Sequence, residues 1–481
     1  MKLTRLLYSG FMLLSYPQHG DACPALSPHE QEVVGAMIKI AVASENPGSA
    51  LWRNFSPFFT PLAIQFQNKK TLLINHPNPP AGYSPLTATC PGIVKGKYSQ
   101  SIFLGTENKH FPQTLNHATI NRSQVFAILD EGHSTPADFT AFAVHEIFHL
   151  FQNKTFQFRE TPVSDSITPD SLAGEYKERL ALGRALYSKT PVWEAEFVSL
   201  RNTRYKNQDR GLTSLQDKEE LTEGTASYVG LRALAILRQD TTAPGELFTD
   251  LVAAKLFPKI IPYSKRPFYG TGAALCLLLD RRGKDWQKAI EGGAAPFEVF
   301  SAIAERIEKK RRYFAPFTGL AKDQISWSEA KKKELLAEFY NSHNVRLIVE
   351  FQSKSEVSGS GKGSVNISYP VGTNRTLVYP DYLEFSKEPE FKLTVQKSLF
   401  LLSHSAKADK DNYRLYSYET PVFRPTNIEI TIDGKVAGLD AGTKYFHKIT
   451  FNSGNISLTL NAKGKFANLG NVFTITSGKI D

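Results

Sequence analysis

Cysteine is scarce in this sequence, with three residues among 481. No two of them have the close spacing of a Cys-ligated zinc or iron–sulfur site, so sites of that kind are excluded. Cys23 and Cys90 both precede proline in turn-rich sequence and could form one disulfide if the chain is exported. Cys276 lies in an apolar run and is expected to be a buried, unreactive thiol.

The sequence also lacks any further run of about 18 apolar residues that could cross a bilayer as a helix. Its first 22 residues resemble a secretory signal peptide: Lys2 and Arg5 precede a short apolar stretch, and small residues stand at positions 20 and 22. Lipoprotein anchoring at Cys23 is the less favoured alternative, because Gly20 occupies the position where leucine is usual. We therefore expect a secreted or periplasmic protein without stable membrane insertion.

Basic residues are in moderate excess, since 57 basic and 47 acidic residues give a formal net charge of +10. The densest basic runs, Lys309–Arg312 and Lys331–Lys333, have helical spacing around them and are interpreted as solvated helix faces. Gly359–Ser364 differs from a phosphate-binding loop, because Gly363 follows its lysine and no helix is predicted after it. No nucleic-acid-binding module is found, so no nucleic-acid partner is expected.

The hydrophobic patterning changes along the chain and predicts an α+β protein. Strands are interleaved with a first helix before residue 135, helical periodicity dominates to residue 345, and alternation typical of strands follows. We expect a signal peptide at 1–22, an N-terminal α/β part at 23–135, a mainly helical part at 136–345 and a β-sandwich-like domain at 346–481. The expected strands before residue 135 are 62–66, 71–75, 101–105 and 124–129, and later helices are 136–153, 172–188, 192–205, 217–237, 246–255, 271–282, 296–312 and 328–342.

The predicted helix 136–153 contains a His-Glu-x-x-His pattern. Thr135 is a good N-cap for this helix, and proline follows at its first position. His145 and His149 then lie one turn apart on one face and can both reach one Zn²⁺ ion. Glu146 lies beside them and can take a proton from a water that the metal activates.

A catalytic zinc site needs a third protein ligand and one open position. Gln152 and Thr155 occupy the positions where a three-histidine pattern requires glycine and histidine, which excludes that class. A turn at 168–170 occupies the positions where a glutamate about twenty residues further on would bind. The third ligand must therefore come from a more distant part of the chain.

The next candidate for the third ligand is Glu223, which opens a Glu-Gly-x-Ala-x-Tyr pattern in the predicted helix 217–237. Gly224 destabilises a helix by about 1 kcal/mol relative to alanine, so it predicts close packing, here against the His-Glu-x-x-His helix. Glu220 and Glu196 remain open as alternatives.

At these residues the chain resembles the gluzincin side of the zincin metallopeptidases, over residues 124–280 at most. The resemblance implies that His145, His149 and Glu223 bind Zn²⁺ and that Glu146 is the general base. It also implies that the α/β part and the helical part together form a zincin-like catalytic domain.

The expected reaction also needs a group that stabilises the oxyanion. Tyr269, next to a predicted buried helix, and Tyr228 are the candidates, and a packed aromatic is the alternative for each. His133, just before the motif helix, could contact substrate, although a role in the loop is favoured. The strand 124–129 is expected to offer an edge on which a peptide substrate can pair.

These inferences predict an exported zinc metallopeptidase that hydrolyses peptide or protein substrates, with Glu146 as general base. Two alternatives stay open: a non-catalytic binding protein that keeps the zincin fold, and a zinc hydrolase of non-peptide amides or esters. The sequence does not indicate substrate preference or oligomeric state.

Overall fold

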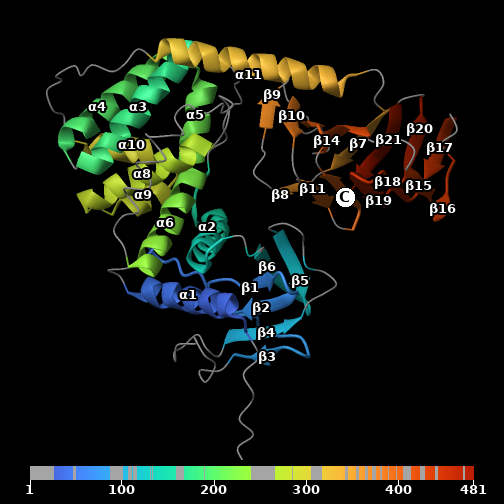
Figure 1. Ribbon diagram of the computed structural model, residues 1–481, viewed down its shortest axis with the longest axis horizontal. Helices are drawn as coiled ribbons and strands as arrows, with labels where there is room; N and C mark the ends of the chain where they lie inside the picture. The colour runs from blue at the N-terminus through green and yellow to red at the C-terminus, as the bar shows by residue number, and fades with distance from the viewer. Residues whose placement is uncertain are drawn as a thin grey trace, which may run out of the picture.

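The protein, seen here as a computed structural model, has an α+β fold followed by an all-β region (Figure 1). Helix α1 (Pro28–Glu45) and a six-stranded sheet come first, helices between residues 136 and 303 follow, and the long helix α11 (Thr318–Phe339) leads to the all-β region. None of the described helices is both long and apolar enough to cross a membrane.

The structure describes residues 26–46, 50–86, 101–106, 111, 116–130, 132, 134–158, 167–188, 190–239, 266–283, 285–304, 317–341, 345–353, 357–362, 367–370, 375–379, 382–387, 389–396, 398–404, 413–422, 428–438, 442–469 and 472–480. Several predictions lie outside these residues: the signal peptide, the pairing of Cys23 with Cys90, the role of His133, and the helix at 246–255.

The N-terminal sheet is mixed, and its strand order is β3-β4-β2-β1-β6-β5. Its strands are β1 (Leu62–Phe66), β2 (Lys70–Ile74), β3 (Ser84–Pro85), β4 (Ile102–Thr106), β5 (Asn116–Ile120) and β6 (Ser123–Asp130). The strands predicted at 62–66 and 71–75 are confirmed as β1 and β2, which pair antiparallel as a hairpin. The predicted free edge at 124–129 is wrong in large part: β5 pairs with β6 from Ser123 to Ala127, and only Ile128–Asp130 extends past it.

The helical part comprises α2 (Pro136–Thr155), α3 (Pro169–Ser188), α4 (Pro191–Asn207), α5 (Arg210–Glu219), the π turn η2 (Glu220–Gly224), α6 (Thr225–Arg238), α8 (Arg266–Arg282), α9 (Trp286–Glu291) and α10 (Pro296–Ile303). The single helix predicted at 217–237 is therefore three consecutive pieces. Asp209 explains the earlier start, because its carboxylate accepts hydrogen bonds from the backbone N–H groups of Gly211 and Leu212 and caps α5.

One hydrophobic core joins α1, the N-terminal sheet and the helices. The fully buried Trp52 lies in this core, with its ring centroid 5.2 Å from that of Phe148 on α2 and 5.2 Å from that of Trp286 on α9. Cys276 on α8 is fully buried as predicted. The N-terminal sheet and the helices up to α10 therefore fold as one unit around a shared core.

The C-terminal region is all-β, as the alternating pattern predicts, and its two sheets pack face to face around a second core. Between the sheets, the ring centroids of Phe351 and Phe391 are 4.5 Å apart. One sheet holds β7 (Val345–Ser353), β9 (Ile367–Pro370), β10 (Arg375–Tyr379), β13 (Phe400–His404), β14 (Arg414–Val422), β17 (Gly442–Phe446), β20 (Gly464–Asn468) and β21 (Val472–Ile480). The other holds β8 (Ser358–Lys362), β11 (Tyr382–Lys387), β12 (Phe391–Gln396), β15 (Glu429–Ile432), β16 (Lys435–Val436), β18 (Ile449–Asn452) and β19 (Ile456–Leu460).

Helix α11 packs on both parts of the molecule (Figure 1). Near its start, Ala321 belongs to a small cluster with Leu172 and Tyr176 of α3. Near its end, Leu335 and Phe339 belong to another cluster with leucines of the eight-stranded sheet. The helix therefore connects the helical part to the β-sandwich through two separate hydrophobic contacts.

Candidate metal centre

Helix α2 forms where its local signals predict. Thr135 accepts a hydrogen bond from the backbone N–H of Asp138 at 3.2 Å, and Pro136 occupies the first helical position. Its apolar face, which includes Val144, Phe148 and Phe151, is buried in the core. The two histidines lie to one side of this face, beside the buried Ala141 and Gln152, and are themselves only partly buried.

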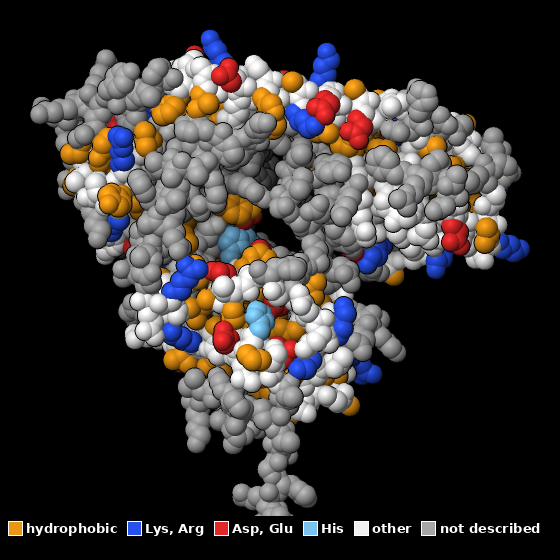
Figure 2. Space-filling view, viewed as in Figure 1, with side chains coloured by type: hydrophobic (Ala, Val, Ile, Leu, Met, Phe, Trp, Pro, Cys, Tyr) orange, Lys and Arg blue, Asp and Glu red, His pale blue; other side chains and the backbone are white. Residues whose placement is uncertain are grey.

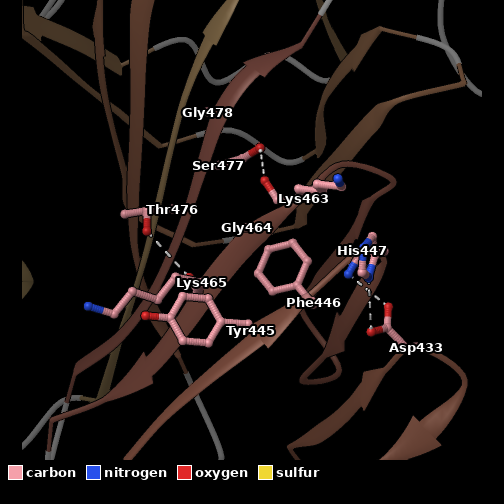
Figure 3. A pocket seen from close by; sticks show the side chains of 10 residues that line it. All are labelled: Asp433, Tyr445, Phe446, His447, Lys463, Gly464, Lys465, Thr476, Ser477 and Gly478. Carbon is pink, nitrogen blue, oxygen red and sulfur yellow. Dashed lines mark hydrogen bonds and ion pairs between the residues drawn. The ribbon is translucent and has the colours of Figure 1, made fainter.

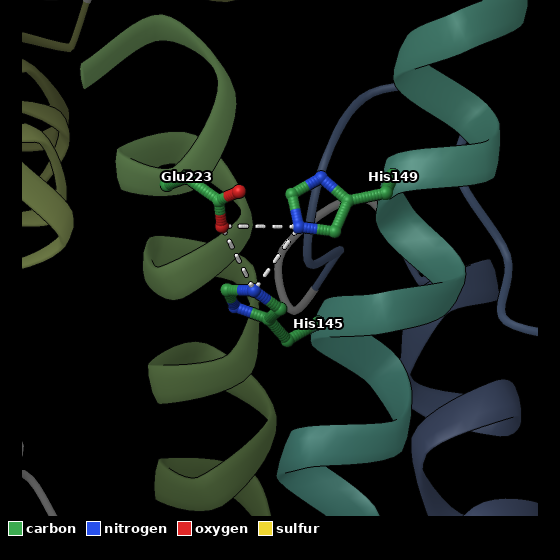
Figure 4. A group of neighbouring side chains, drawn as sticks. All are labelled: His145, His149 and Glu223. Atoms are coloured by element: carbon green, nitrogen blue, oxygen red, sulfur yellow. Dashed lines mark hydrogen bonds and ion pairs between the residues drawn. The ribbon is translucent and has the colours of Figure 1, made fainter. Parts of the chain in front are cut away.

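Three side chains from two elements converge in front of α2 (Figure 4). His145 Nε2 and His149 Nε2 are 3.2 Å apart. Glu223 Oε2, from the π turn, is 3.5 Å from His145 Nε2 and 3.2 Å from His149 Nε2. Among the described residues, these three form the one group of His, Cys, Asp or Glu side chains close enough to hold a metal ion together.

The triangle formed by these three atoms has the dimensions of a zinc ligand set. Zinc binds imidazole nitrogen and carboxylate oxygen at about 2.0–2.2 Å, so two ligands of a tetrahedral ion lie about 3.3 Å apart. The observed sides of 3.2, 3.2 and 3.5 Å bracket this value. The point equidistant from the three atoms is about 1.9 Å from each, so an ion at normal bond lengths fits just outside their plane.

The three side chains are partly open to solvent, with exposed fractions of 14% for His145, 25% for His149 and 23% for Glu223. A space-filling view shows histidine side chains in a hollow in the middle of the molecule (Figure 2). The three side chains are therefore only partly buried and are not sealed inside the core.

Glu223 projects from a π turn rather than from a regular helix. Turns of this type are wider than an α-helical turn and occur often at functional sites. Glu220 belongs to the same turn but points into the protein, where it is fully buried. Its carboxylate accepts hydrogen bonds from Arg201 at 2.8 Å and Thr271 at 2.6 Å, so it is engaged away from the histidines. Glu196, on α4, is also outside the three-residue group.

Glycines set how closely the helices around the site approach one another. A Cβ atom on Gly224 would lie 2.6 Å from the Cα of Gly272 on α8, so these backbones are in contact. The prediction that Gly224 faces the motif helix is therefore wrong. Gly230 makes that contact instead, since a Cβ there would lie 3.1 Å from the carbonyl oxygen of Ala141 and 3.4 Å from the Cβ of His145.

The ionisable groups at the site shift one another's pKa values. Burial would raise the pKa of Glu223, but hydrogen bonds from His145 and His149 outweigh burial and lower it. Burial lowers the pKa of His149, but the carboxylates of Glu223 and Glu146 outweigh that and raise it. The carboxylate of Glu223 and the imidazole of His149 therefore stabilise each other's charged forms.

Glu146 has the environment of a proton acceptor that can also return the proton. Burial raises its pKa, the charges of His145 and His149 oppose the rise, and the charge of Glu223 adds to it. A carboxyl whose pKa is moved toward neutrality can both accept and release a proton near neutral pH.

The two candidate tyrosines have different positions. Tyr269, in the first turn of α8, stacks on His145 with ring centroids 6.1 Å apart, and its hydroxyl donates a hydrogen bond to Glu223. The structure therefore brings Tyr269 into contact with His145 and Glu223. Tyr228 is buried, and its hydroxyl donates to Asp280 at 2.6 Å. The structure places Tyr228 in the core, as a packed aromatic.

Three features of the site were not predicted from the sequence. Gln152, considered only as a break in the three-histidine pattern, contacts His149 Nδ1 at 2.7 Å. Its spacing three residues after His149 was the available signal, because it places both side chains on one helix face. The buried Arg201 and the contact of Gly224 with Gly272 have no comparable local signal.

A second opening lies far along the chain, in the β-sandwich (Figure 3). This groove of about 600 Å³ is lined by residues of β17, β20 and β21, among them Tyr445 and Lys465, and by residues next to strands, such as Lys463. None of its lining residues belongs to the three-residue group. The groove is therefore separate from the candidate metal centre.

Comparison with known proteins gives no match for this chain among protein-family models, curated proteins or solved structures.

Proposed function

We propose that this chain is a zinc-dependent peptidase whose catalytic domain is zincin-like and consists of the N-terminal sheet and the helices up to α10. One observation carries the proposal: His145, His149 and Glu223 place three ligand atoms 3.2 to 3.5 Å apart. A set of three protein ligands is that of a catalytic zinc, whereas structural zinc sites usually have four.

The proposed reaction assigns the proton transfers to Glu146. Zinc, when bound, supplies a Lewis acid that polarises the substrate carbonyl and makes the attacking water more acidic. Glu146 accepts the proton of that water and then delivers it to the nitrogen of the leaving amine. The raised pKa of Glu146 supports both halves of this role.

Tyr269 is the proposed donor to the oxyanion. Its hydroxyl already hydrogen-bonds Glu223, so it lies beside the ligands and can turn toward a substrate oxygen. Tyr228 is not proposed for this role, because its hydroxyl is engaged with Asp280 inside the core.

The test compares the wild-type chain with Glu146→Gln. The wild-type protein should purify with, or take up, one zinc ion per chain and should cleave members of a fluorogenic peptide library. Glu146→Gln should keep the zinc and lose at least about 10²-fold in kcat/KM, because the amide cannot accept the proton. Glu334→Gln, on the exposed surface of α11, is the matched control and should leave both quantities unchanged.

Each alternative predicts a different result. A chain that binds no zinc and cleaves no peptide supports the non-catalytic binding protein. A chain that binds zinc and hydrolyses only simple esters or non-peptide amides supports the third class of activity. Full peptidase activity in the Glu146→Gln protein would remove Glu146 from the mechanism.

A further inference from the structure

Gln152 is the residue that connects the two elements of the candidate metal centre. It lies on α2, one turn after His149, and only 1% of it is exposed. Its amide nitrogen reaches the π turn, with distances of 2.7 Å to the carbonyl oxygen of Thr222 and 2.7 Å to Oγ1 of Thr225. Its amide oxygen lies 2.7 Å from Nδ1 of His149.

The contacts of Gln152 allow one orientation of its amide. A backbone carbonyl can only accept a hydrogen bond, so the group facing Thr222 must be the NH₂ group. Thr225 donates its own hydroxyl proton to the carbonyl of Leu221 at 2.7 Å, which leaves its oxygen free to accept from Gln152. The carbonyl oxygen of the amide therefore faces His149.

This orientation favours a proton on Nδ1 of His149, the ring nitrogen that faces Gln152. The amide oxygen of Gln152 can only accept, so Nδ1 of His149 must donate. In the charged imidazole Nε2 also carries a proton and donates to Glu223. In the neutral imidazole with its proton on Nδ1, Nε2 has a free lone pair. Nε2 is the atom that faces His145 and Glu223, so the lone pair points to the place where a metal would bind.

The same amide also limits how far Glu223 can move from His149. The carbonyl of Thr222 belongs to the peptide group that joins Thr222 to Glu223, and Gln152 binds that carbonyl. One rigid amide group thus spans from the ring of His149 to the backbone beside Glu223. A substitution that removes the amide of Gln152 should therefore affect the positions of both His149 and Glu223.

We propose that Gln152 is a positioning residue that fixes the tautomer of His149 and holds Glu223 at ligand distance, an inference that rests on the proposed zinc-dependent function. Partners of this kind, which contact a ligand rather than the metal, typically change metal affinity 10- to 100-fold when they are removed. The inference concerns zinc binding, so it can be tested without measuring hydrolysis.

The first measurement uses the metal-free wild-type protein with ¹⁵N-labelled histidine, at a pH at which the imidazoles are neutral. Long-range ¹H–¹⁵N spectra distinguish a proton on Nδ1 from one on Nε2, and the signals absent from a His149→Asn variant identify this residue. The expected result is a proton on Nδ1. A proton mainly on Nε2 overturns the inference, whether or not any variant folds.

The second measurement compares variants. Gln152→Leu removes both contacts and should bind zinc 10- to 100-fold more weakly in competition with a chromophoric chelator, with His149 shifting to a mixture of tautomers. Gln152→Glu keeps an acceptor toward His149 and should keep the wild-type tautomer. Gln65→Leu, which alters another buried glutamine on β1, is the matched control and should leave zinc affinity unchanged.

The outcomes separate this inference from the proposed function. Wild-type zinc affinity and an unchanged tautomer in Gln152→Leu would mean that Gln152 serves packing alone, which overturns the inference. A wild-type protein that binds zinc but cleaves no peptide would overturn the proposed activity and leave the assignment of Gln152 standing.

Discussion

The contact between Gly224 and Gly272 predicts that Gly224→Ala damages the metal centre without touching a ligand. A Cβ atom on Gly224 would lie 2.6 Å from the Cα of Gly272 and 3.2 Å from the carbonyl oxygen of Phe268. Both neighbours are backbone atoms of α8, so no side chain can turn aside. The π turn and α8 must therefore move apart.

The structure gives the size of this effect. Carbon atoms pack at about 3.5–4.0 Å, so relief of a 2.6 Å contact requires a separation of about 1 Å. Overpacking of this kind costs about 1–3 kcal/mol, and the better helix propensity of alanine returns at most about 1 kcal/mol. A movement of about 1 Å also exceeds the tolerance of about 0.2 Å on metal–ligand distances, so zinc affinity should fall by at least about tenfold.

The assay combines urea denaturation with zinc titration against a chromophoric chelator. Gly319→Ala is the matched control, because a Cβ at that position of α11 has no heavy atom within 4 Å. This control should show unchanged zinc affinity and equal or slightly higher stability. Gly224→Ala with the unfolding midpoint and the zinc affinity of the wild type would refute the reasoning.

Three further predictions concern other residues. Burial and the charge of Glu220 raise the pKa of Asp217 to about 6, so the folded state binds its proton more tightly than the unfolded state and stability falls as pH rises from about 4 to about 6. Asp217→Asn should remove this pH dependence of the free energy of unfolding, which amounts to at most about 3 kcal/mol between pH 4 and pH 7 and can be measured by urea denaturation. A variant whose stability varies with pH as the wild type does would contradict the prediction. Arg201→Met should lower the free energy of unfolding by about 3–5 kcal/mol, because it leaves the carboxylate of Glu220 buried without its cation. A loss under about 1 kcal/mol would mean that the ion pair with Arg201 does not stabilise the buried Glu220. Tyr269→Phe should lower kcat about 10²-fold with little change in zinc content, whereas Tyr228→Phe should leave kcat unchanged, and equal effects of the two would count against Tyr269 as the oxyanion donor.

Helix α2 was predictable because several local signals coincide there. Thr135 caps it, Pro136 begins it, and apolar residues recur on its buried face. Signals of this type act within one or two turns, so they can be read from neighbouring residues. The helix consequently begins where it was expected and ends two residues later, at Thr155.

The choice of Glu223 over Glu220 could not be made from the sequence in the same way. Both carboxylates lie within one turn, and the residue that separates their roles is Arg201, which draws Glu220 into the core from α4. The predicted packing partner of Gly224 was wrong for a similar reason, because its actual partner, Gly272, lies 48 residues further along the chain. Contacts between distant residues depend on the tertiary fold, which local patterns do not determine.

Helix α11 has a mechanical consequence for large partners. Its 22 residues make a rod about 33 Å long, with one hydrophobic cluster joining it to α3 and another joining it to the eight-stranded sheet. A rod of this kind transmits rotation: one residue inserted into its middle would turn the β-sandwich by about 100° around the helix axis and advance it by about 1.5 Å. The number of residues in α11 therefore sets the direction from which the sandwich faces the rest of the molecule, and a protein that touches both must match that fixed angle.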